Sequence, residues 1–173
     1  MSVPTTVSIP PAGTYKLDPA ASSVTFATRH MFGLGGVTGS FKVLSGEITI
    51  ADPVTSSTAT AVIDAASFAT GSAARDKDVK SANFLHVQDH PEITFRSTEL
   101  EESGEGWVLR GQITARGHAA RADVALSEVR ADSDGLTIRA TCRVDRYAHG
   151  ITKKKGMAGR FLDLEVTARA MPV

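Results

Sequence analysis

The polar stretch RDKDVKSANFLHVQDHPEITF, at residues 75–95, carries the residue types that could do chemistry. His86 and His90 are spaced as i and i+4, and on a helix that spacing can present two imidazoles to one zinc ion. Asp89 or Glu92 could complete such a site and support a metal-assisted hydrolase or isomerase. However, no glutamate lies between the histidines as in helical metalloprotease motifs, and the following proline favours a turn. We therefore favour surface or packing roles for both histidines and expect no metal.

The other polar motifs are also interpreted as structural. Arg75-Asp76 and Asp145-Arg146 are adjacent pairs, and since neighbours on a helix do not face each other, we expect them to tie segments together rather than to catalyse. The glycine-rich run at residues 33–36 is not followed by the helical pattern that a phosphate-binding loop requires. The lysine run at residues 153–155 could touch an anionic membrane surface, but a solvated loop is the simpler interpretation.

Nucleophilic catalysis has no motif in this sequence. There is no G-x-S-x-G, and Cys142 falls on the apolar face of its strand pattern, where a thiol packs as a small hydrophobic group. A single cysteine also excludes an internal disulfide. The residues therefore predict a protein that is not an enzyme and that needs no cofactor.

Composition narrows the class of protein. The chain has 173 residues, which is the usual size of one domain, and its formal net charge is zero, so it offers no basic face to nucleic acid. No stretch is apolar enough to span a bilayer, and the start, MSVPTTVSIPPAG, lacks the basic and apolar regions of a signal peptide. The expectation is a cytoplasmic protein with a flexible tail at residues 1–12 and one domain at residues 13–173.

Alternation of apolar and polar residues dominates that domain. Repeats of period two occur at Val24/Phe26, Ile93/Phe95, Leu109/Ile113, Val124/Leu126, Ile138/Val144 and Leu162/Val166. They predict half-buried antiparallel strands, and about eight such strands suit an up-and-down barrel. Two strands are expected within residues 37–50, with kinks or bulges at Gly39 and Gly46. Residues 72–85 favour a short helix with Ser72 as its N-cap, and Pro91 ends any helix before the next strand.

Several stretches, taken in order, resemble one known family. They are Tyr15-Lys16-Leu17-Asp18, Ser23-Val24-Thr25-Phe26, Gly39-Ser40-Phe41, Gly46-Glu47-Ile48, Thr70-Gly71, Arg75-Asp76, Val79-Lys80-Ser81, Phe84, Val87, Pro91-Glu92-Ile93-Thr94-Phe95, Gly111-Gln112-Ile113-Thr114, Gly117, Val144-Asp145-Arg146-Tyr147 and Gly150. In this order they resemble the YceI-like family of polyisoprenoid-binding, lipocalin-like proteins. The resemblance covers about residues 13 to 169, and the Arg75 to Phe95 block is its most specific part.

The resemblance implies an all-β fold, an extended eight-stranded antiparallel lipocalin-like β-barrel with a short inserted helix, whose apolar interior holds an isoprenoid chain. This sequence departs from the family pattern in two ways. Many relatives carry an export signal, which this sequence does not show. Leu85 and His86 stand where the family pattern favours a second aromatic and an acidic residue. The residue types add one point of their own, because small inward residues such as Gly111, Ala140 and Ala168 would leave volume inside a barrel.

The leading hypothesis is a non-catalytic protein that sequesters or carries a polyisoprenoid or similar long-chain lipid. Three groups of residues are expected to bind the ligand. The wall is expected to consist of Phe26, Phe41, Val43, Phe95, Leu109, Ile138 and Leu164. Phe68 and Phe84 are expected to gate the end near the helix, and the polar side chains of Arg29, His30 and Arg75 are expected to meet a head group. The alternatives are that large aromatic residues fill the core completely, that the chain is the His86/His90 enzyme, or that it is an interaction module without a ligand. A homodimer through strand faces or edges is compatible with the pattern.

Overall fold

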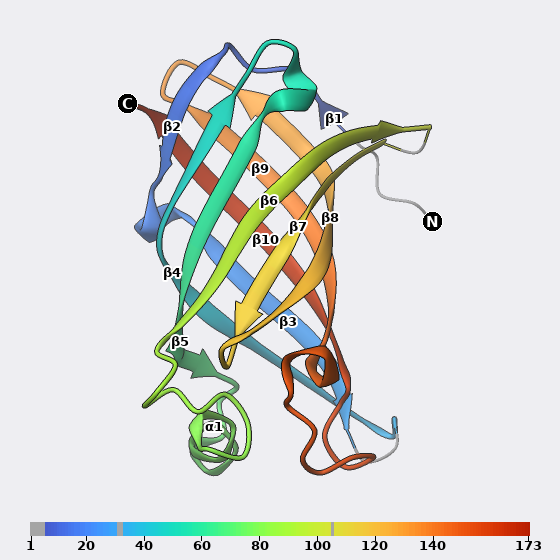
Figure 1. Ribbon diagram of the computed structural model, residues 1–173. Coiled ribbons are helices and arrows are strands. Elements are labelled where there is room, and N and C mark those ends of the chain that lie inside the picture. Colours follow the sequence, from blue (N-terminus) through green and yellow to red (C-terminus); the bar gives the residue numbers. More distant parts are fainter. Residues whose placement is uncertain (1–5, 31–32, 105) are drawn as a thin grey trace.

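The computed structural model of the protein describes residues 6–30, 33–104 and 106–173, with the side chain of His30 left out (Figure 1). It confirms an all-β fold with a closed eight-stranded antiparallel barrel and one short helix. The strands are β1 (Thr6–Val7), β2 (Gly13–Leu17), β3 (Ser23–His30), β4 (Gly35–Ile50), β5 (Thr58–Ala69), β6 (Glu92–Ser103), β7 (Gly106–Ala115), β8 (His118–Ala131), β9 (Leu136–Asp145) and β10 (Phe161–Pro172). The helix is α1 (Ala73–Lys80), and three short 3-10 helices are η1 (Pro19–Ala21), η2 (Val54–Ser56) and η3 (Arg146–His149).

The barrel closes because β10 returns to the first strands of the chain. From β4 to β10 each strand pairs with the next in antiparallel register. β10 then pairs along residues 162–167 with β3 and along residues 170–172 with β2, and both of these strands also pair with β4. Strands β2 and β3 thus share one position in the wall, which η1 interrupts, and no long edge is left between β10 and β4.

Strand β4 corrects one detail of the sequence prediction. The two strands expected within residues 37–50 are one strand, with register shifts between Ser40 and Lys42 and between Val43 and Ser45. These shifts lie next to the two glycines at which kinks or bulges were predicted, and the glycines also serve a second purpose. A Cβ at Gly39 would collide with the ring of Phe26, and a Cβ at Gly46 with the side chain of Leu17. The absence of a side chain at both glycines therefore leaves room for neighbouring side chains to lie close to the β4 backbone.

The two ends of the barrel are closed differently. At the turn end, where η2 and the β8–β9 turn lie (upper part of Figure 1), the core is a cluster of Tyr15, Ile48, Ile50, Leu136 and Ala170. At the opposite end, which we call the helix end because α1 lies there, the cluster is Phe26, Phe68, Phe84, Leu85 and Ile151. The turn end is therefore built from strand residues, whereas two connections between strands supply part of the helix end.

The segment between β5 and β6 forms the predicted helix at its start. Ser72 caps α1, with its Oγ accepting from the Arg75 amide at 3.3 Å, and the helix ends at Lys80 rather than continuing to residue 85. Asp76 confirms the expected structural tie, because its carboxylate accepts hydrogen bonds from the amide (3.0 Å) and the hydroxyl (2.6 Å) of Thr70. That hydroxyl bond is the main reason that the pKa of Asp76 is lowered.

The N-terminal residues that the structure describes lie against the barrel. Within the predicted tail of residues 1–12, β1 pairs in parallel with β8, and Ser8 donates its amide to the carbonyl of Val129 at 2.9 Å. Residues 1–5 of that tail lie outside the described part of the chain. Among the described residues, no helix is long and apolar enough to cross a bilayer.

Candidate functional site

The barrel encloses an apolar cavity of about 300 Å³ that reaches both ends. Ile50 and Val54 line it at the turn end, and Leu85 and Ile151 line it at the helix end. Between them the wall comes from alternate residues of the strands, as the pleat requires. Besides short hydroxyl side chains and Cys142, the polar residues that line it among the described ones are Arg146 and His149. A volume of this size is within the range of small-molecule binding sites.

The structure places six of the predicted wall residues in the lining of this cavity. They are Phe41, Val43, Phe95, Leu109, Ile138 and Leu164. Of the small residues expected to leave volume, Ala140 and Ala168 line the cavity. Gly111 works differently, because a Cβ there would collide with the ring of Phe95, so this glycine makes room for an aromatic side chain rather than for a ligand.

The remaining predicted aromatic residues form a plug at the helix end. Phe26 and Phe68 stack with ring centroids 5.2 Å apart, and Phe41 contacts both rings at 5.7 and 5.5 Å. Phe84 joins them from the segment after α1, and Phe26, Phe68 and Phe84 are all about 95% buried. Such tilted and stacked arrangements suit aromatic quadrupoles, so the plug is a packed core and not a loose lid.

Two of the three predicted head-group residues, Arg29 and Arg75, lie outside this cavity. Arg29 is exposed near the end of β3, where its Nη1 donates to the carbonyl of Gly33 at 3.3 Å. Arg75 is exposed on α1. His30 ends β3, and its side chain lies outside the described residues. Arg29 on β3 and Arg75 on α1 border the helix end without lining the cavity itself.

Arg146 is a cavity residue that the sequence reasoning did not select. Its side chain is 6% exposed and donates to three backbone carbonyls, those of Gly159 (2.8 Å), Ile151 (2.8 Å) and Ala158 (3.2 Å). The guanidinium also lies over the ring of Phe84 at 5.6 Å. Burial lowers the pKa of this guanidinium. A guanidinium has five N–H donors, so two remain beyond these three bonds.

His149 accompanies Arg146 at the same end of the cavity. It is 3% exposed, and its Nδ1 lies 2.8 Å from the carbonyl oxygen of His118. Because a carbonyl can only accept, Nδ1 carries the proton, and in the neutral ring Nε2 is left as an acceptor.

A signal for Arg146 existed in the sequence: the inward alternation of β9 that runs through Cys142 and Val144 continues to residue 146. Asp145, on the outward side, pairs with Arg160 instead of with Arg146.

The structure places the groups that were considered for catalysis as follows. Cys142 is buried in the cavity wall as predicted, and burial raises the pKa of its thiol to about 11, which disfavours the nucleophilic thiolate. His86 pairs with Asp89 at 3.3 Å, and its ring lies 5.7 Å from that of His90. Within the described residues, no three His, Cys, Asp or Glu side chains are grouped so that they could hold a metal ion.

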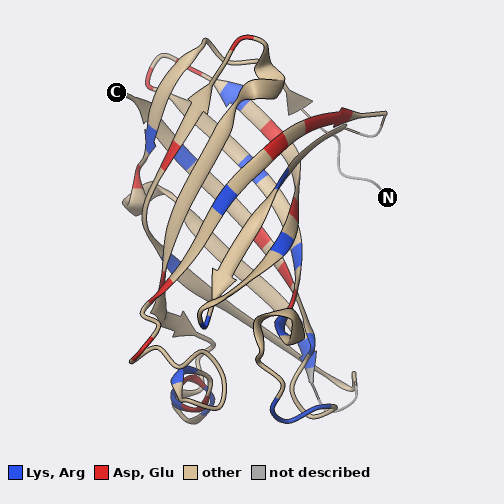
Figure 2. Cartoon of the chain, in the orientation of Figure 1, with Lys and Arg blue, Asp and Glu red and all other residues tan. Residues whose placement is uncertain are grey.

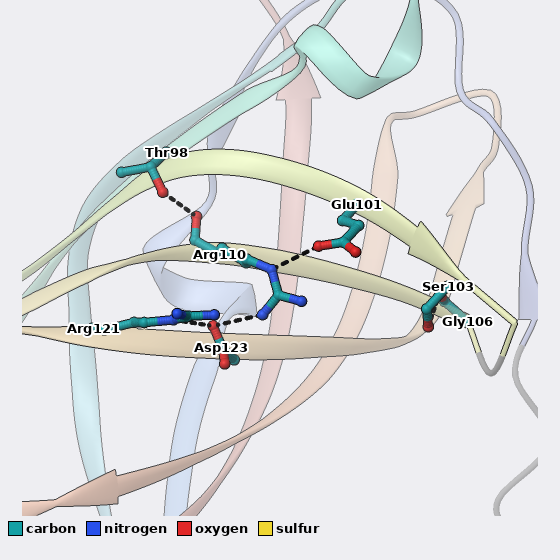
Figure 3. Close-up of polar contacts among 7 residues, drawn as sticks. All are labelled: Thr98, Glu101, Ser103, Gly106, Arg110, Arg121 and Asp123. Carbon is teal, nitrogen blue, oxygen red and sulfur yellow. Dashed lines mark hydrogen bonds and ion pairs between the residues drawn. The ribbon is translucent and has the colours of Figure 1, made fainter.

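Charged side chains gather on the outer wall instead. Figure 3 shows Arg110 on β7 between two carboxylates, with Nε 2.8 Å from Glu101 and Nη1 3.2 Å from Asp123. Arg121 reaches the same Asp123 at 3.2 Å. The hydrogen bond to Glu101 is the main reason that the pKa of Arg110 is raised. These ion pairs are largely exposed, so they favour solubility of the wall and contribute little to its stability.

Comparison with known proteins decides the family. The sequence profile of the YceI-like domain matches residues 15–170 of this chain. The chain belongs to the YceI-like domain family. Among curated YceI-like relatives, the UPF0312 proteins of Pectobacterium carotovorum and Serratia proteamaculans are 35% and 34% identical over 109 residues. Each match covers 61% of this chain and 56% of the relative, so the chain matches about half the length of these relatives.

Solved structures agree with the YceI-like fold. BcnA of Burkholderia cenocepacia is 20% identical with a TM-score of 0.79, covering 90% of this chain and 99% of that one. A polyisoprenoid-binding domain from Saccharophagus degradans, described as implicated in plant cell wall breakdown, is 16% identical with a TM-score of 0.72, covering 92% and 98%. At these identities the likeness establishes the YceI-like barrel and no more.

Proposed function

We propose that this YceI-like barrel binds and carries a polyisoprenoid or a similar long-chain apolar lipid, without catalysing a reaction on it. The observation that carries the proposal is the cavity, whose lining is apolar over the length of the barrel. The family membership supports a lipid-binding barrel, and the Saccharophagus degradans neighbour is itself described as a polyisoprenoid-binding domain. A binding role also agrees with the buried, protonated state of the Cys142 thiol.

The wall can supply affinity without a polar anchor. Each isoprene unit has five carbons, and burying each carbon contributes about 0.8 kcal/mol, so one unit contributes about 4 kcal/mol before ordering costs. Phe41, Val43, Phe95, Leu109, Ile138 and Leu164 are the proposed contacts for the chain. Several isoprene units would thus suffice for tight binding, and the chemistry of the wall would select for an apolar chain rather than for one particular lipid.

The polar end of the ligand is proposed to lie at the helix end. Arg146 offers the two N–H donors that its carbonyl bonds leave, which could bind a hydroxyl, phosphate or carboxylate, and an unprotonated Nε2 of His149 could accept from a hydroxyl. Phe26, Phe68 and Phe84 would have to move for a head group to pass outward. Arg29, His30 and Arg75 would then meet the part that emerges.

The experiment that tests this proposal begins with native protein. Lipids extracted from the purified, non-denatured chain are identified by mass spectrometry against a mock purification, and the protein is then titrated with a fluorescent polyprenyl probe. We expect a stoichiometric isoprenoid, or saturable uptake of the probe where the expression host has supplied none. A chain that carries no lipid and takes up neither polyprenyl nor fatty acyl probes would refute the proposal.

A pair of variants on one strand supplies the control. Ile138 and Thr141 both lie on β9, but Ile138 lines the cavity and Thr141 is exposed on the outer wall. Ile138→Lys places a charge in the apolar interior and should abolish probe uptake, whereas Thr141→Lys should leave it unchanged. Circular dichroism of Ile138→Lys establishes whether the barrel is folded. Normal uptake by a folded Ile138→Lys barrel would show that the ligand does not use this cavity.

A further inference from the structure

The surface at the helix end combines basic charge with exposed apolar side chains. The connection from η3 to β10, residues 150–160, contains Lys153, Lys154, Lys155 and Arg160 and no acidic residue. Figure 2 shows its basic colour at the extreme end of the molecule, beyond the barrel wall. Met157 within this connection is 48% exposed.

The hairpin between β3 and β4 belongs to the same surface. Leu34 at this hairpin is 89% exposed. The hairpin and the basic connection are in contact, since a Cβ at Gly159 would collide with Thr28 and with the carbonyl of Arg29. We call the surface made by Arg29, Leu34, Lys153, Lys155 and Met157 the basic end patch. It unites cationic groups with two apolar tips that project from separate connections.

Four acidic residues near this end are in contact with other groups. Asp78 pairs with Lys154 at 2.6 Å, and Asp145 pairs with Arg160 at 2.9 Å. Asp89 lies 3.3 Å from His86, and Asp76 accepts from Thr70. The local acids thus offset Lys154 and Arg160, which hold the connection in place. Lys153, Lys155 and Arg29 remain as the basic side chains of the patch, with the Lys155 ammonium over the ring of Tyr147 at 5.2 Å.

We propose that the basic end patch docks the barrel onto an anionic lipid bilayer. A lysine close to an anionic leaflet raises membrane affinity about fivefold, and exposed apolar side chains can enter the boundary between head groups and acyl chains. A protein partner would instead need a broad apolar centre with matching shape, and two separate tips do not form one. The far part of β6 carries Glu99, Glu101 and Glu102, so an anionic surface would repel the opposite end and orient the barrel (Figure 2).

This orientation has a consequence for loading the cavity. The aromatic plug and Arg146 lie at the same end as the patch, so a docked barrel would face the bilayer with the end where the proposed head-group residues lie. A lipid could then pass between membrane and cavity without crossing water. This consequence rests on the proposed function, whereas docking itself depends on the patch alone.

Vesicle binding tests the docking directly. The full chain is sedimented with phosphatidylcholine vesicles, with and without one third phosphatidylglycerol, at low and at high salt. We expect binding to the phosphatidylglycerol vesicles that falls steeply with salt. The variant Lys153→Gln/Lys155→Gln removes two charges and should weaken this binding about 25-fold. The matched variant Lys16→Gln/Arg130→Gln removes two exposed charges at the turn end and should bind as the unmodified chain does.

Several results of this experiment would overturn the proposal. They are equal binding to both kinds of vesicle, no binding to either, and the same loss of affinity in the two double variants. Binding that occurs only with an anionic polymer such as heparin would also overturn it, because a polyelectrolyte and not a bilayer would then be the partner.

Insertion of the apolar tips is tested by a local probe. A Met157→Cys variant is labelled with a polarity-sensitive dye, and Cys142 should not compete because it is buried and burial raises the pKa of its thiol to about 11. We expect a blue shift with phosphatidylglycerol vesicles and none with phosphatidylcholine alone. An unshifted spectrum during full vesicle binding would show that the tips stay in water and would refute this part of the proposal.

Docking and lipid carriage can fail separately. Uptake of a polyprenyl probe from detergent solution reports the cavity alone, and uptake from phosphatidylglycerol vesicles reports both steps. We expect Lys153→Gln/Lys155→Gln to fill from detergent at the normal extent but to fill from vesicles more slowly. A chain that binds vesicles but takes up no lipid from either source would refute the proposed function without contradicting the docking proposal.

Discussion

The two ends of this barrel solve the same packing problem with different parts. At the turn end, Leu136 is fully buried against Tyr15, Ile48 and Ile50, and all of these residues belong to paired strands. At the helix end, Phe84, Leu85 and Ile151 come from connections that lie outside the strands. Strand residues are held by continuous ladders of backbone bonds on both sides, so the turn end moves only if the sheet does.

The connections at the helix end depend on a small number of polar contacts. Arg116 donates to the carbonyls of Ala82 (2.5 Å) and Phe84 (2.6 Å), and Arg146 donates to three carbonyls of residues 151–159. These arginine side chains add to backbone hydrogen bonds within the connections, such as that from the Leu85 amide to the Val79 carbonyl (2.8 Å) and that from the Ile151 amide to the Arg146 carbonyl (3.1 Å). The comparison shows that paired strands close one end of the barrel and that connections between strands close part of the other, which is where we propose that a ligand enters.

Matched leucine truncations should separate the two ends most clearly. Leu136→Ala leaves a cavity in a wall that cannot collapse and should lower the free energy of unfolding by about 4 kcal/mol. Leu85→Ala should lower it by about 2 kcal/mol, because the segment around Leu85 can shift toward the space. Urea unfolding of both variants measures the difference. Equal losses would mean that the helix end is as rigid as the turn end.

Variants of Arg146 should show that this one side chain stabilises the connection at the helix end. Arg146→Met keeps much of the packing but leaves three carbonyls without their donor, so we expect about 2 kcal/mol of destabilisation. Amide hydrogen exchange should rise in residues 150–160 and stay unchanged at the turn end. Arg146→Lys keeps the charge but cannot reach three carbonyls with a planar fork, so it should rescue only in part. Exchange that rises equally throughout the barrel would contradict a local role.

Much of the wall could be predicted from the sequence because its physics is local. A residue in a strand faces inward or outward by parity alone, so alternation sufficed to place Ile138, Leu109 and Leu164 on the inner face. The cap on α1 was predictable for the same reason, since Ser72 satisfies an amide three residues away.

The helix end could be predicted less well because its contacts are distant in sequence. Arg146 and Gly159 are 13 residues apart, and Arg116 and Phe84 are 32 apart, with no periodicity that connects them. The alternation of inward residues did extend from Val144 to Arg146. However, Asp145-Arg146 was interpreted as a structural pair, whereas in the structure Asp145 pairs with Arg160. Likewise, the kinks or bulges predicted at Gly39 and Gly46 agree with the nearby register shifts, but the close contacts there could not be predicted, because the side chains that fill those spaces belong to other strands.

Helix α1 offers a smaller test of how independently the helix end moves. Ser72→Ala removes the N-cap and should cost α1 about 1 kcal/mol. None of the helix residues is buried, so we expect this loss as faster exchange of the α1 amides with little change in the urea midpoint. Ser8→Ala, which alters a hydroxyl at the other end of the barrel, should leave those amides unaffected. A midpoint shift as large as the helix effect would show that α1 unfolds only with the barrel.

The smallest expected effect concerns the turn end and depends on pH. Asp132 accepts hydrogen bonds from Arg169 at 2.8 Å and from the amides of Asp134 and Gly135, and these bonds, chiefly those from Arg169, hold its pKa well below the ordinary value. The unfolded chain therefore takes up a proton at higher pH than the folded one, so the stabilisation is complete above about pH 4 and is lost as the pH falls through the lowered folded value.

Asp132→Asn should lower the urea midpoint at neutral pH, and the difference from the unmodified chain should shrink in acid. Asp134→Asn changes the same charge without removing the bonds to Arg169, so its effect should be smaller. A deficit of Asp132→Asn that stays constant down to strongly acidic pH would mean that turn geometry, and not the carboxylate charge, closes this end.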